Sequence, residues 1–157
     1  MSPPNIMIYT DGGASPNPGL GAYAAVLLHK DQRKEISGVV PNVTNNQMEL
    51  TGAIEALKLL PKPCIVTLRS DSKYLCDAFQ KKWINKWQKN GWETSTGEPV
   101  SNKNLWEELI RLSGIHQITW EWVKGHSDNI ENNRCDELVK LARDDFREKQ
   151  KLENQSR

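Results

Sequence analysis

Four acidic residues stand where carboxylates can meet to bind metal ions: Asp11, Glu49, Asp71 and Asp136. Asp11 and Asp71 each close an apolar run typical of a strand, Glu49 lies near the start of a predicted helix, and Asp136 follows a loop that carries His126. Acids at strand ends can converge at one edge of a sheet, and because converging carboxylates repel one another, they need cations between them. The pattern therefore predicts a metal-dependent active site.

Each of these acids also has an ordinary structural explanation. Asp11 precedes a glycine, a pair typical of a turn, and Asp71 can cap the helix that follows it. Glu49 and Asp136 fit exposed acids on helices. The hypothesis of a metal site therefore depends on all four residues occurring together, in this order and in these contexts.

Other polar side chains allow two interpretations each. His126 fits an exposed loop residue and equally a group that transfers protons beside the carboxylates. A second set fits turns and helix caps, or contacts with a bound ligand. That set is Asn17, Thr44, Asn45, Asn46 and Ser72. The cap explanation is strong for Thr44 and Ser72, whereas a ligand would better explain two asparagines at a helix start.

A segment between residues 81 and 104 combines positive charge with tryptophan. It holds five lysines against two glutamates, a local net charge of +3, and three of the six tryptophans of the chain. The pattern fits an amphipathic surface with its tryptophans in the core, and equally a nucleic-acid contact surface. The candidate contacts are Lys81, Lys82, Trp83, Lys86, Trp87 and Lys89.

Hydrophobic patterning indicates a sheet in the first part of the chain. Strands are predicted at residues 5–11, 22–29 and 34–40, with a hairpin at Asp31-Gln32 and an end of the third strand at Pro41. The chain therefore begins with three predicted strands.

Helices alternate with strands in the remainder. Thr44 is a predicted N-cap with Gln47 as its capping-box partner, and the helix that follows extends to Leu60. A strand buried on both faces is predicted at 64–68. Further helices are predicted at 73–80 and from Leu105 until Gly114, with a strand at 117–123 and a last helix from Cys135 to Phe146. These elements predict an α/β fold with a mixed sheet flanked by helices.

The whole chain sets wider bounds. Its 157 residues fit one domain, and the net charge of +1 says little about partners. Three widely spaced cysteines without a C-x-x-C pair predict reduced thiols in a cytoplasmic protein. No apolar stretch approaches the length of a membrane span, so no membrane association is expected. The tail at 147–157 is charged and is expected to be frayed or disordered, which leaves a domain at 1–146.

Four motifs together resemble a known family. They are Tyr9-Thr-Asp-Gly-Gly, Thr44-Asn-Asn-Gln-Met-Glu49, Ser70-Asp71-Ser-Lys-Tyr74, and Trp122-Val-Lys-Gly-His126 followed by Asp136. With these motifs the chain resembles type 1 ribonuclease H in its bacterial single-domain form, from residue 5 to about residue 146. The lysine and tryptophan segment resembles the basic protrusion of that family.

The resemblance implies a five-stranded mixed sheet with three antiparallel strands first. It implies an endonuclease that hydrolyses the RNA strand of RNA–DNA hybrids and leaves 3′-hydroxyl and 5′-phosphate ends. The implied cofactor is Mg²⁺, two ions per site, with Mn²⁺ as a substitute. Asp11 would bridge the two ions, Asp136 would share the ion on the water side, and Glu49 and Asp71 would hold the ion near the leaving oxygen. His126 would assist proton transfer or product release.

The resemblance also implies contacts with the hybrid. Asn17 and Asn45 match positions that read 2′-hydroxyl groups, and Thr44 and Asn46 match part of a pocket for a DNA phosphate. Lys73 stands where relatives often have glutamine, so the same hydrogen bond is not expected there. No obligate protein partner is implied, and a monomer is expected.

Two alternative hypotheses compete with a hybrid-specific nuclease. One is a nuclease of the same fold that acts on DNA, and the set Asn17, Thr44 and Asn45 argues against it. The other is a non-catalytic nucleic-acid-binding module. An acid cluster beside bound phosphate would weaken binding if it held no metal, so the intact set of carboxylates favours an enzyme.

Overall fold

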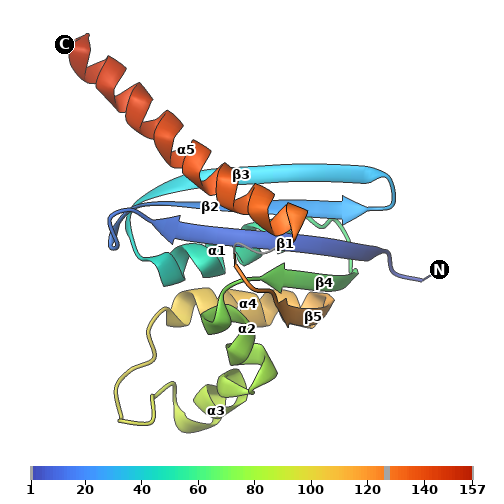
Figure 1. The fold of residues 1–157 in the computed structure, drawn as a ribbon. Helices are drawn as coiled ribbons and strands as arrows, with labels where there is room; N and C mark the ends of the chain where they lie inside the picture. Colours follow the sequence, from blue (N-terminus) through green and yellow to red (C-terminus); the bar gives the residue numbers. More distant parts are fainter. Residues whose placement is uncertain (1, 126–127, 157) are drawn as a thin grey trace.

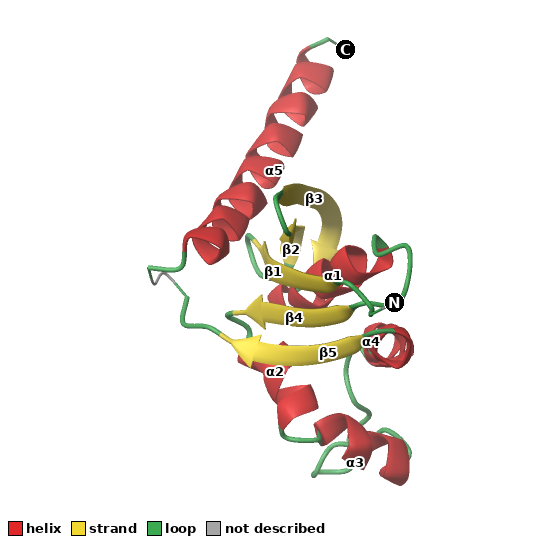
Figure 2. Ribbon diagram, turned by 90° about the vertical axis from the view of Figure 1, so that its right-hand side faces the viewer, coloured by secondary structure: helices red, strands yellow, loops and turns green. Residues whose placement is uncertain are grey.

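The computed structural model describes residues 2–125 and 128–156 of the chain. In that part of the chain, five strands form one sheet in the order β3-β2-β1-β4-β5 (Figure 2). β1, β2 and β3 are antiparallel, whereas β4 lies parallel to both β1 and β5. The strands are β1 (Asn5–Ala14), β2 (Gly19–His29), β3 (Gln32–Val43), β4 (Ile65–Ser70) and β5 (Gln117–Trp122). This topology confirms the predicted fold class.

Helices cover both faces of the sheet (Figure 1). They are α1 (Asn45–Lys58), α2 (Lys73–Gln80), α3 (Trp83–Asn90), α4 (Lys103–Ile115) and α5 (Ile130–Gln155). α1, α2 and α4 pack on one face, whereas α5 crosses the other face over β1, β2 and β3. Among the described residues, no helix is both long and apolar enough to cross a membrane.

Alternation along the strands separates two hydrophobic cores. Ile8 and Leu68 face the larger core, which they share with the buried side chains of α1, α2 and α4. Tyr9 and Val26 face the smaller core, where Cys135 of α5 is fully buried. Because successive side chains of a strand point to opposite faces, β1 contributes to both cores and fixes α1 and α5 relative to each other.

Strand β1 continues through Asp11 to Ala14. The sequence also allowed a turn at the aspartate–glycine pair of residues 11 and 12. Asp11 pairs with Ala24 of β2. A Cβ atom at Gly12 would lie 2.4 Å from the backbone carbonyl of Met48 in α1. The glycine therefore serves the close approach of a helix to the strand, and the turn explanation of Asp11 is wrong.

Caps and strand ends follow local chemistry. The predicted capping box at Thr44 and Gln47 is present, with both reciprocal hydrogen bonds made. Ser72 caps α2 by accepting from Leu75 N, so Asp71 is not the cap of that helix. β3 runs past Pro41 to Val43 because it is an edge strand, where a missing N–H need not break a ladder.

Two further expectations differ from the structure. β4 alternates between buried and half-buried residues instead of being buried on both faces, because α5 covers β1 to β3 and leaves β4 partly open. α4 continues through Gly114 to Ile115.

The last helix continues well past the predicted boundary at Phe146. α5 runs to Gln155, and its final turns project beyond the sheet (Figure 1). The side chain of Arg147 donates a hydrogen bond to the backbone oxygen of Ser15, and Lys151 lies 3.6 Å from Glu148 one turn earlier. The charged segment is therefore helical, and at Arg147 it is bonded to Ser15, where the sequence predicted a frayed or disordered tail.

Candidate active site

Three carboxylates meet beside the ends of two parallel strands. Each of Asp11, Glu49 and Asp71 offers an oxygen, and the three oxygens lie within 4.8 Å of one another. Asp11 and Asp71 come together because β1 and β4 are paired in parallel, with Thr10 opposite Ser70, so that Asp11 within β1 and Asp71 just after β4 come next at the same level. The sequence prediction that these acids converge is therefore confirmed for three of the four.

Glu49 reaches this cluster from α1. Its Oε1 accepts a hydrogen bond of 2.6 Å from the backbone nitrogen of Gly12. This contact requires α1 to lie against β1, which is possible because position 12 carries no side chain. A residue that looks like an ordinary helical glutamate in the sequence is therefore buried, with 8% of its surface exposed.

Burial and mutual repulsion change the acidity of the cluster. The pKa of Asp11 is raised from 3.8 to about 7, first by burial and then by the charge of Asp71. Burial and the charge of Asp11 also raise the pKa of Glu49. Buried acids in such proximity cannot all hold negative charge without a cation, and carboxylate oxygens are the ligands that Mg²⁺ prefers. The residues present therefore fit a divalent metal ion.

Asp136 lies at the margin of the cluster. Its oxygen is not among the three that meet, and its Oδ2 lies 3.0 Å from Nζ of Lys140. Its negative charge nevertheless contributes to raising the pKa of Asp11. The neighbouring Cys135 explains the placement, since its buried thiol donates to the backbone oxygen of Tyr9, two residues before Asp11. Cys135 is thus a packing residue that sets Asp136 beside the cluster.

Two asparagines connect the loop after β1 to the start of α1. The backbone nitrogen of Asn45 donates to Oδ1 of Asn17 at 3.1 Å, and Oδ1 of Asn45 accepts from Ala14 N at 2.7 Å. Both side chains are exposed. Thr44 is occupied as the cap of α1 and Asn46 is exposed in its first turn. The structure thus brings four of the five predicted polar residues to one corner of the molecule, next to the end of β1, whereas Ser72 caps α2.

Lys73 and Trp122 frame the cluster on the β5 side. Nε1 of Trp122 donates to the backbone oxygen of Asp71 at 2.9 Å, and Nζ of Lys73 lies 4.8 Å from the centre of the Trp122 ring. Sequence reasoning missed this role of Trp122, because the residue stood only in a predicted strand and in the motif that leads to His126. Lys73 is exposed and its charge rests over the ring.

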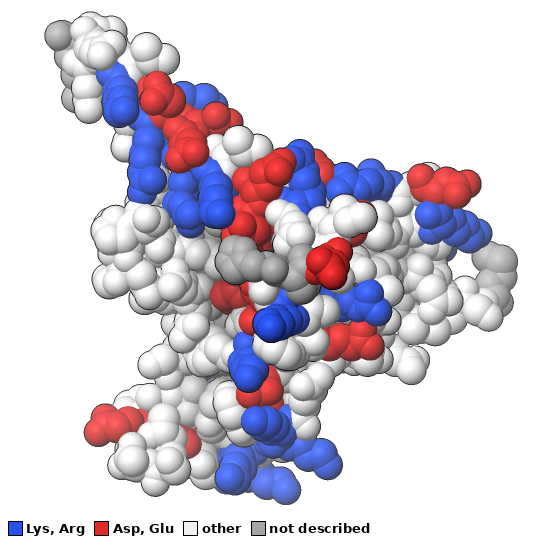
Figure 3. Space-filling model, viewed as in Figure 1, with Lys and Arg blue, Asp and Glu red and all other residues white. Residues whose placement is uncertain are grey.

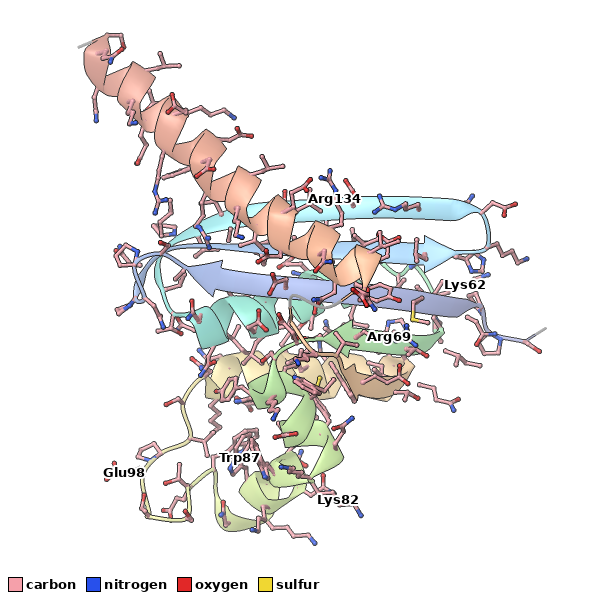
Figure 4. All side chains as sticks on the ribbon, in the orientation of Figure 1. Lys62, Arg69, Lys82, Trp87, Glu98 and Arg134 are labelled. Carbon is pink, nitrogen blue, oxygen red and sulfur yellow. The ribbon has the colours of Figure 1, made fainter. Side chains whose placement is uncertain are left out.

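In the segment around α3, the tryptophans lie on the inner side and the lysines on the outer side. Trp87 lies 5.5 Å from Trp106 and 6.4 Å from Trp83, measured between ring centres. Figure 4 shows Trp87 on the inner side of α3 and Lys82 on its outer side. The predicted contacts Lys81, Lys82, Lys86 and Lys89 are all exposed, and Lys81 pairs with Asp77 at 3.3 Å. The tryptophans therefore build the protrusion and the lysines form its surface.

One predicted site residue cannot be placed. His126 lies outside the described residues, between Gly125 and Asp128. A Cβ atom at Gly125 would lie 2.9 Å from Oδ2 of Asp71, so the segment that leads to His126 passes directly beside the carboxylate cluster.

Comparisons with known proteins agree with this geometry. The model of the family described as RNase H matches residues 3–144. A ribonuclease H from Moorella thermoacetica is 53% identical over 137 residues, which cover 87% of this chain and 90% of that protein.

Solved structures share the fold. LC9-RNase H1, a type 1 RNase H with the type 2 active-site motif, superposes with a TM-score of 0.79 at 24% identity, over 90% of this chain and 73% of that one. LC11-RNase H1 in complex with an RNA/DNA hybrid has a TM-score of 0.67 at 25% identity, over 90% and 98%. On the strength of the family match and the close curated relative, the chain belongs to the ribonuclease H family of endoribonucleases.

Proposed function

We propose that this protein hydrolyses the RNA strand of RNA–DNA hybrids with two divalent metal ions, and leaves 3′-hydroxyl and 5′-phosphate ends. The observation that carries the proposal is the cluster of Asp11, Glu49 and half-buried Asp71, whose oxygens lie within 4.8 Å of one another. Membership of the ribonuclease H family and the hybrid bound by the related LC11-RNase H1 support the choice of substrate.

The four acids would divide the metal ligands among them. Asp11 would bridge two Mg²⁺ ions, Asp136 would share the one on the side of the attacking water, and Glu49 and Asp71 would hold the one near the leaving oxygen. When bound, such ions neutralise the charge on the entering and leaving oxygens of a phosphodiester. Mn²⁺ has the same preference for oxygen ligands and would substitute.

The remaining residues would handle protons and hold the substrate. His126 would transfer a proton or assist product release. Asn17 and Asn45, already joined by a hydrogen bond, would contact 2′-hydroxyl groups across the minor groove of the hybrid. Thr44 and Asn46 would lie near a phosphate of the DNA strand.

The protrusion would extend this contact surface. Its exposed lysines, on the outer side of α3, would bind phosphates of the hybrid through charge. Lys73 would reach a phosphate by leaving the Trp122 ring. We further propose that the protein acts as a monomer in the cytoplasm, a reducing compartment that suits its three buried, unpaired thiols.

A cleavage assay with one labelled hybrid tests the function. The RNA strand should be cut in the presence of Mg²⁺ and remain intact in EDTA, while duplex DNA remains intact in both. The products should be substrates for a polymerase that extends 3′-hydroxyl ends. An Asp11→Asn protein should still bind the hybrid but should not cut it, because the substitution removes a ligand and an anion together. Equal cleavage of hybrid and duplex DNA would contradict the proposed specificity.

A further inference from the structure

Two arginines of α5 hold the end of β1 and the loop that joins it to β2. Nη1 of Arg143 donates to the backbone oxygen of Gly13 at 3.1 Å, and Nη2 of Arg147 donates to the backbone oxygen of Ser15. We call Arg143 and Arg147 the arginine clamp, and residues 15–18 the β1–β2 loop. Hydrogen bonds from a charged donor are stronger than neutral ones, so Arg143 ties the end of β1 to α5 and Arg147 ties the loop that follows it.

The opposite side of the same loop is tied to α1. Asn45 accepts from Ala14 N with its side chain and donates its own backbone N–H to Oδ1 of Asn17. Inside the loop, Ser15 N donates to Leu20 O at 2.9 Å. Asn17 therefore stands on a loop that α1 holds from one side and the arginine clamp holds from the other.

The clamp differs from the other arginines of α5 and β3 in its partners. Arg134 forms ion pairs with Glu35 and Glu137. Among the described residues, no carboxylate forms an ion pair with Arg143 or Arg147. Figure 3 shows basic side chains gathered along the flank of α5 that faces the β1–β2 loop. The hydrogen bonds of Arg143 and Arg147 go to backbone oxygens at the end of β1 and in the loop, so these two residues act on the position of the loop.

The helix also connects the clamp to the metal cluster. Arg143 and Arg147 lie seven and eleven residues after Asp136, a spacing that places all three on one face of α5. A single rigid helix therefore carries the marginal acid of the cluster and the two residues that hold the loop. Sequence reasoning missed the clamp because Arg147 falls in the segment predicted to be frayed.

We propose that Arg143 and Arg147 are positioning residues that hold Asn17 for its contact with the RNA strand. The inference rests on the proposed function, because it takes the 2′-hydroxyl of a hybrid as the group that Asn17 meets. It adds the last helix to the parts of the molecule that select the substrate. The residues themselves need not touch the hybrid.

The test compares three double variants of α5. Arg143→Ala with Arg147→Ala removes the clamp, and Arg143→Lys with Arg147→Lys keeps one donor at each position. Lys149→Ala with Lys151→Ala removes the same charge from the same helix at exposed positions. Among the described residues, neither lysine makes a hydrogen bond or an ion pair with the loop or the cluster. For each protein, kcat and KM are measured on a hybrid and on hybrids with a single 2′-deoxynucleotide at each position near the cut.

The alanine clamp variant should raise KM roughly 3- to 10-fold, the usual effect of removing one hydrogen bond, and leave kcat nearly unchanged. At the position that Asn17 contacts, a single 2′-deoxynucleotide should raise the KM of the wild type and have little further effect on the KM of this variant. The lysine variant should recover part of the loss, and the Lys149 and Lys151 variant should match the wild type. An equal loss in that control, or an unchanged 2′-deoxy penalty in the alanine variant, would overturn the inference.

Hydrogen exchange separates this inference from the proposed function. In metal-free protein without substrate, the amides of Ala14 and Ser15 should exchange faster in the clamp variant, while that of Ile8 in the middle of β1 should not. Unchanged exchange at Ala14 and Ser15 refutes the clamp even if the enzyme cuts hybrids. If the wild type cuts no hybrid, the proposed function and its 2′-hydroxyl contact are refuted. Faster exchange in the clamp variant would in that case still support the clamp. If the double variant fails to fold, the single substitution Arg147→Ala gives the same comparison, because it removes only the hydrogen bond to Ser15.

Discussion

At the scale of single residues, the site depends on acids that the fold makes costly to ionise. Asp11 and Glu49 are each only 8% exposed, and both have a raised pKa. The glycine at position 12 is as important as the acids, because it lets α1 approach and lets Glu49 bond to the strand. Residues without charge therefore decide whether the charged ones meet.

Asp11 makes the stability of the metal-free protein depend on pH. Its pKa is near the normal 3.8 in the unfolded chain and about 7 in the folded protein, so the folded state binds more protons between these values. Stability should therefore fall as pH rises from about 4 to 7, by about 1.4 kcal/mol for each unit of pKa shift at most.

Asp11→Asn should weaken this dependence and leave the part that burial of Glu49 contributes, so the variant should be more stable than the wild type at pH 8 and similar at pH 4. Urea denaturation in EDTA at both pH values measures the difference. Asp31→Asn, in an exposed turn, is the matched control and should change stability little. If the free energy of unfolding of the wild type were the same at pH 4 and pH 8, the result would contradict the raised pKa of Asp11.

Gly12→Ala should destabilise the protein by about 1–3 kcal/mol, because the new Cβ would lie 2.4 Å from the carbonyl of Met48. Gly114→Ala is the control, since nothing lies within 4 Å of a Cβ there and the residue is inside α4. Alanine is the better helix former, so this control should be neutral or stabilising. Similar denaturation midpoints for the two variants would show that α1 tolerates the displacement.

At the scale of elements, the helices differ in what they do for the site. α1 delivers Glu49 and Asn45, whereas α5 delivers Asp136 and the arginine clamp from the opposite face of the sheet. α3 contributes no acid; its tryptophans pack inward and its lysines face out. The protrusion is therefore a separable element, whose loss should affect binding more than chemistry.

Replacing Lys81, Lys82, Lys86 and Lys89 with glutamine should weaken hybrid binding and reduce its salt dependence. For every phosphate that the variant no longer binds, the slope of log affinity against log salt should become shallower by up to about 0.9. Binding measured at several NaCl concentrations in EDTA gives this slope.

The matched control replaces four exposed lysines at the other end of the sheet: Lys30, Lys34, Lys58 and Lys62. It removes the same charge and should leave the slope almost unchanged. Equal slopes for the two variants would show that α3 has no special role in binding.

At the scale of the whole molecule, the site belongs to the sheet more than to any one element. β1 is the central strand and touches both cores, so α1 and α5 meet its end from opposite faces (Figure 1). Asp71 joins them through the parallel pairing of β1 with β4. A ligand that bridges these acids should therefore stabilise the entire fold.

Mg²⁺ should raise the thermal midpoint of the wild type, because it binds the folded cluster and not the unfolded chain. The gain should be about 1.4 kcal/mol at a concentration ten times the dissociation constant. It should be larger at pH 8 than at pH 5, since the ligands must lose protons to bind. Thermal denaturation with and without Mg²⁺ measures the gain, and the Asp11→Asn protein should show little of it.

Much of the fold followed from local chemistry. Apolar patterning predicted the strands, and the capping box at Thr44 and Gln47 predicted the start of α1. The extent of α5 was not predictable in this way, because Arg147 finds its partner in Ser15, 132 residues away in sequence. The charged sequence of this segment carries no local signal of that distant contact.

The sequence by itself determined which acids were candidates, the order of the strands along the chain and the family that the motifs resemble. The tertiary structure alone decided that Asp11 is inside a strand, that Asp71 leaves the cap to Ser72, and that Asp136 stays at the margin. The physical reason is that convergence of charges depends on strand pairing and on helix approach at Gly12. Both are contacts between residues far apart in sequence, which no local pattern records.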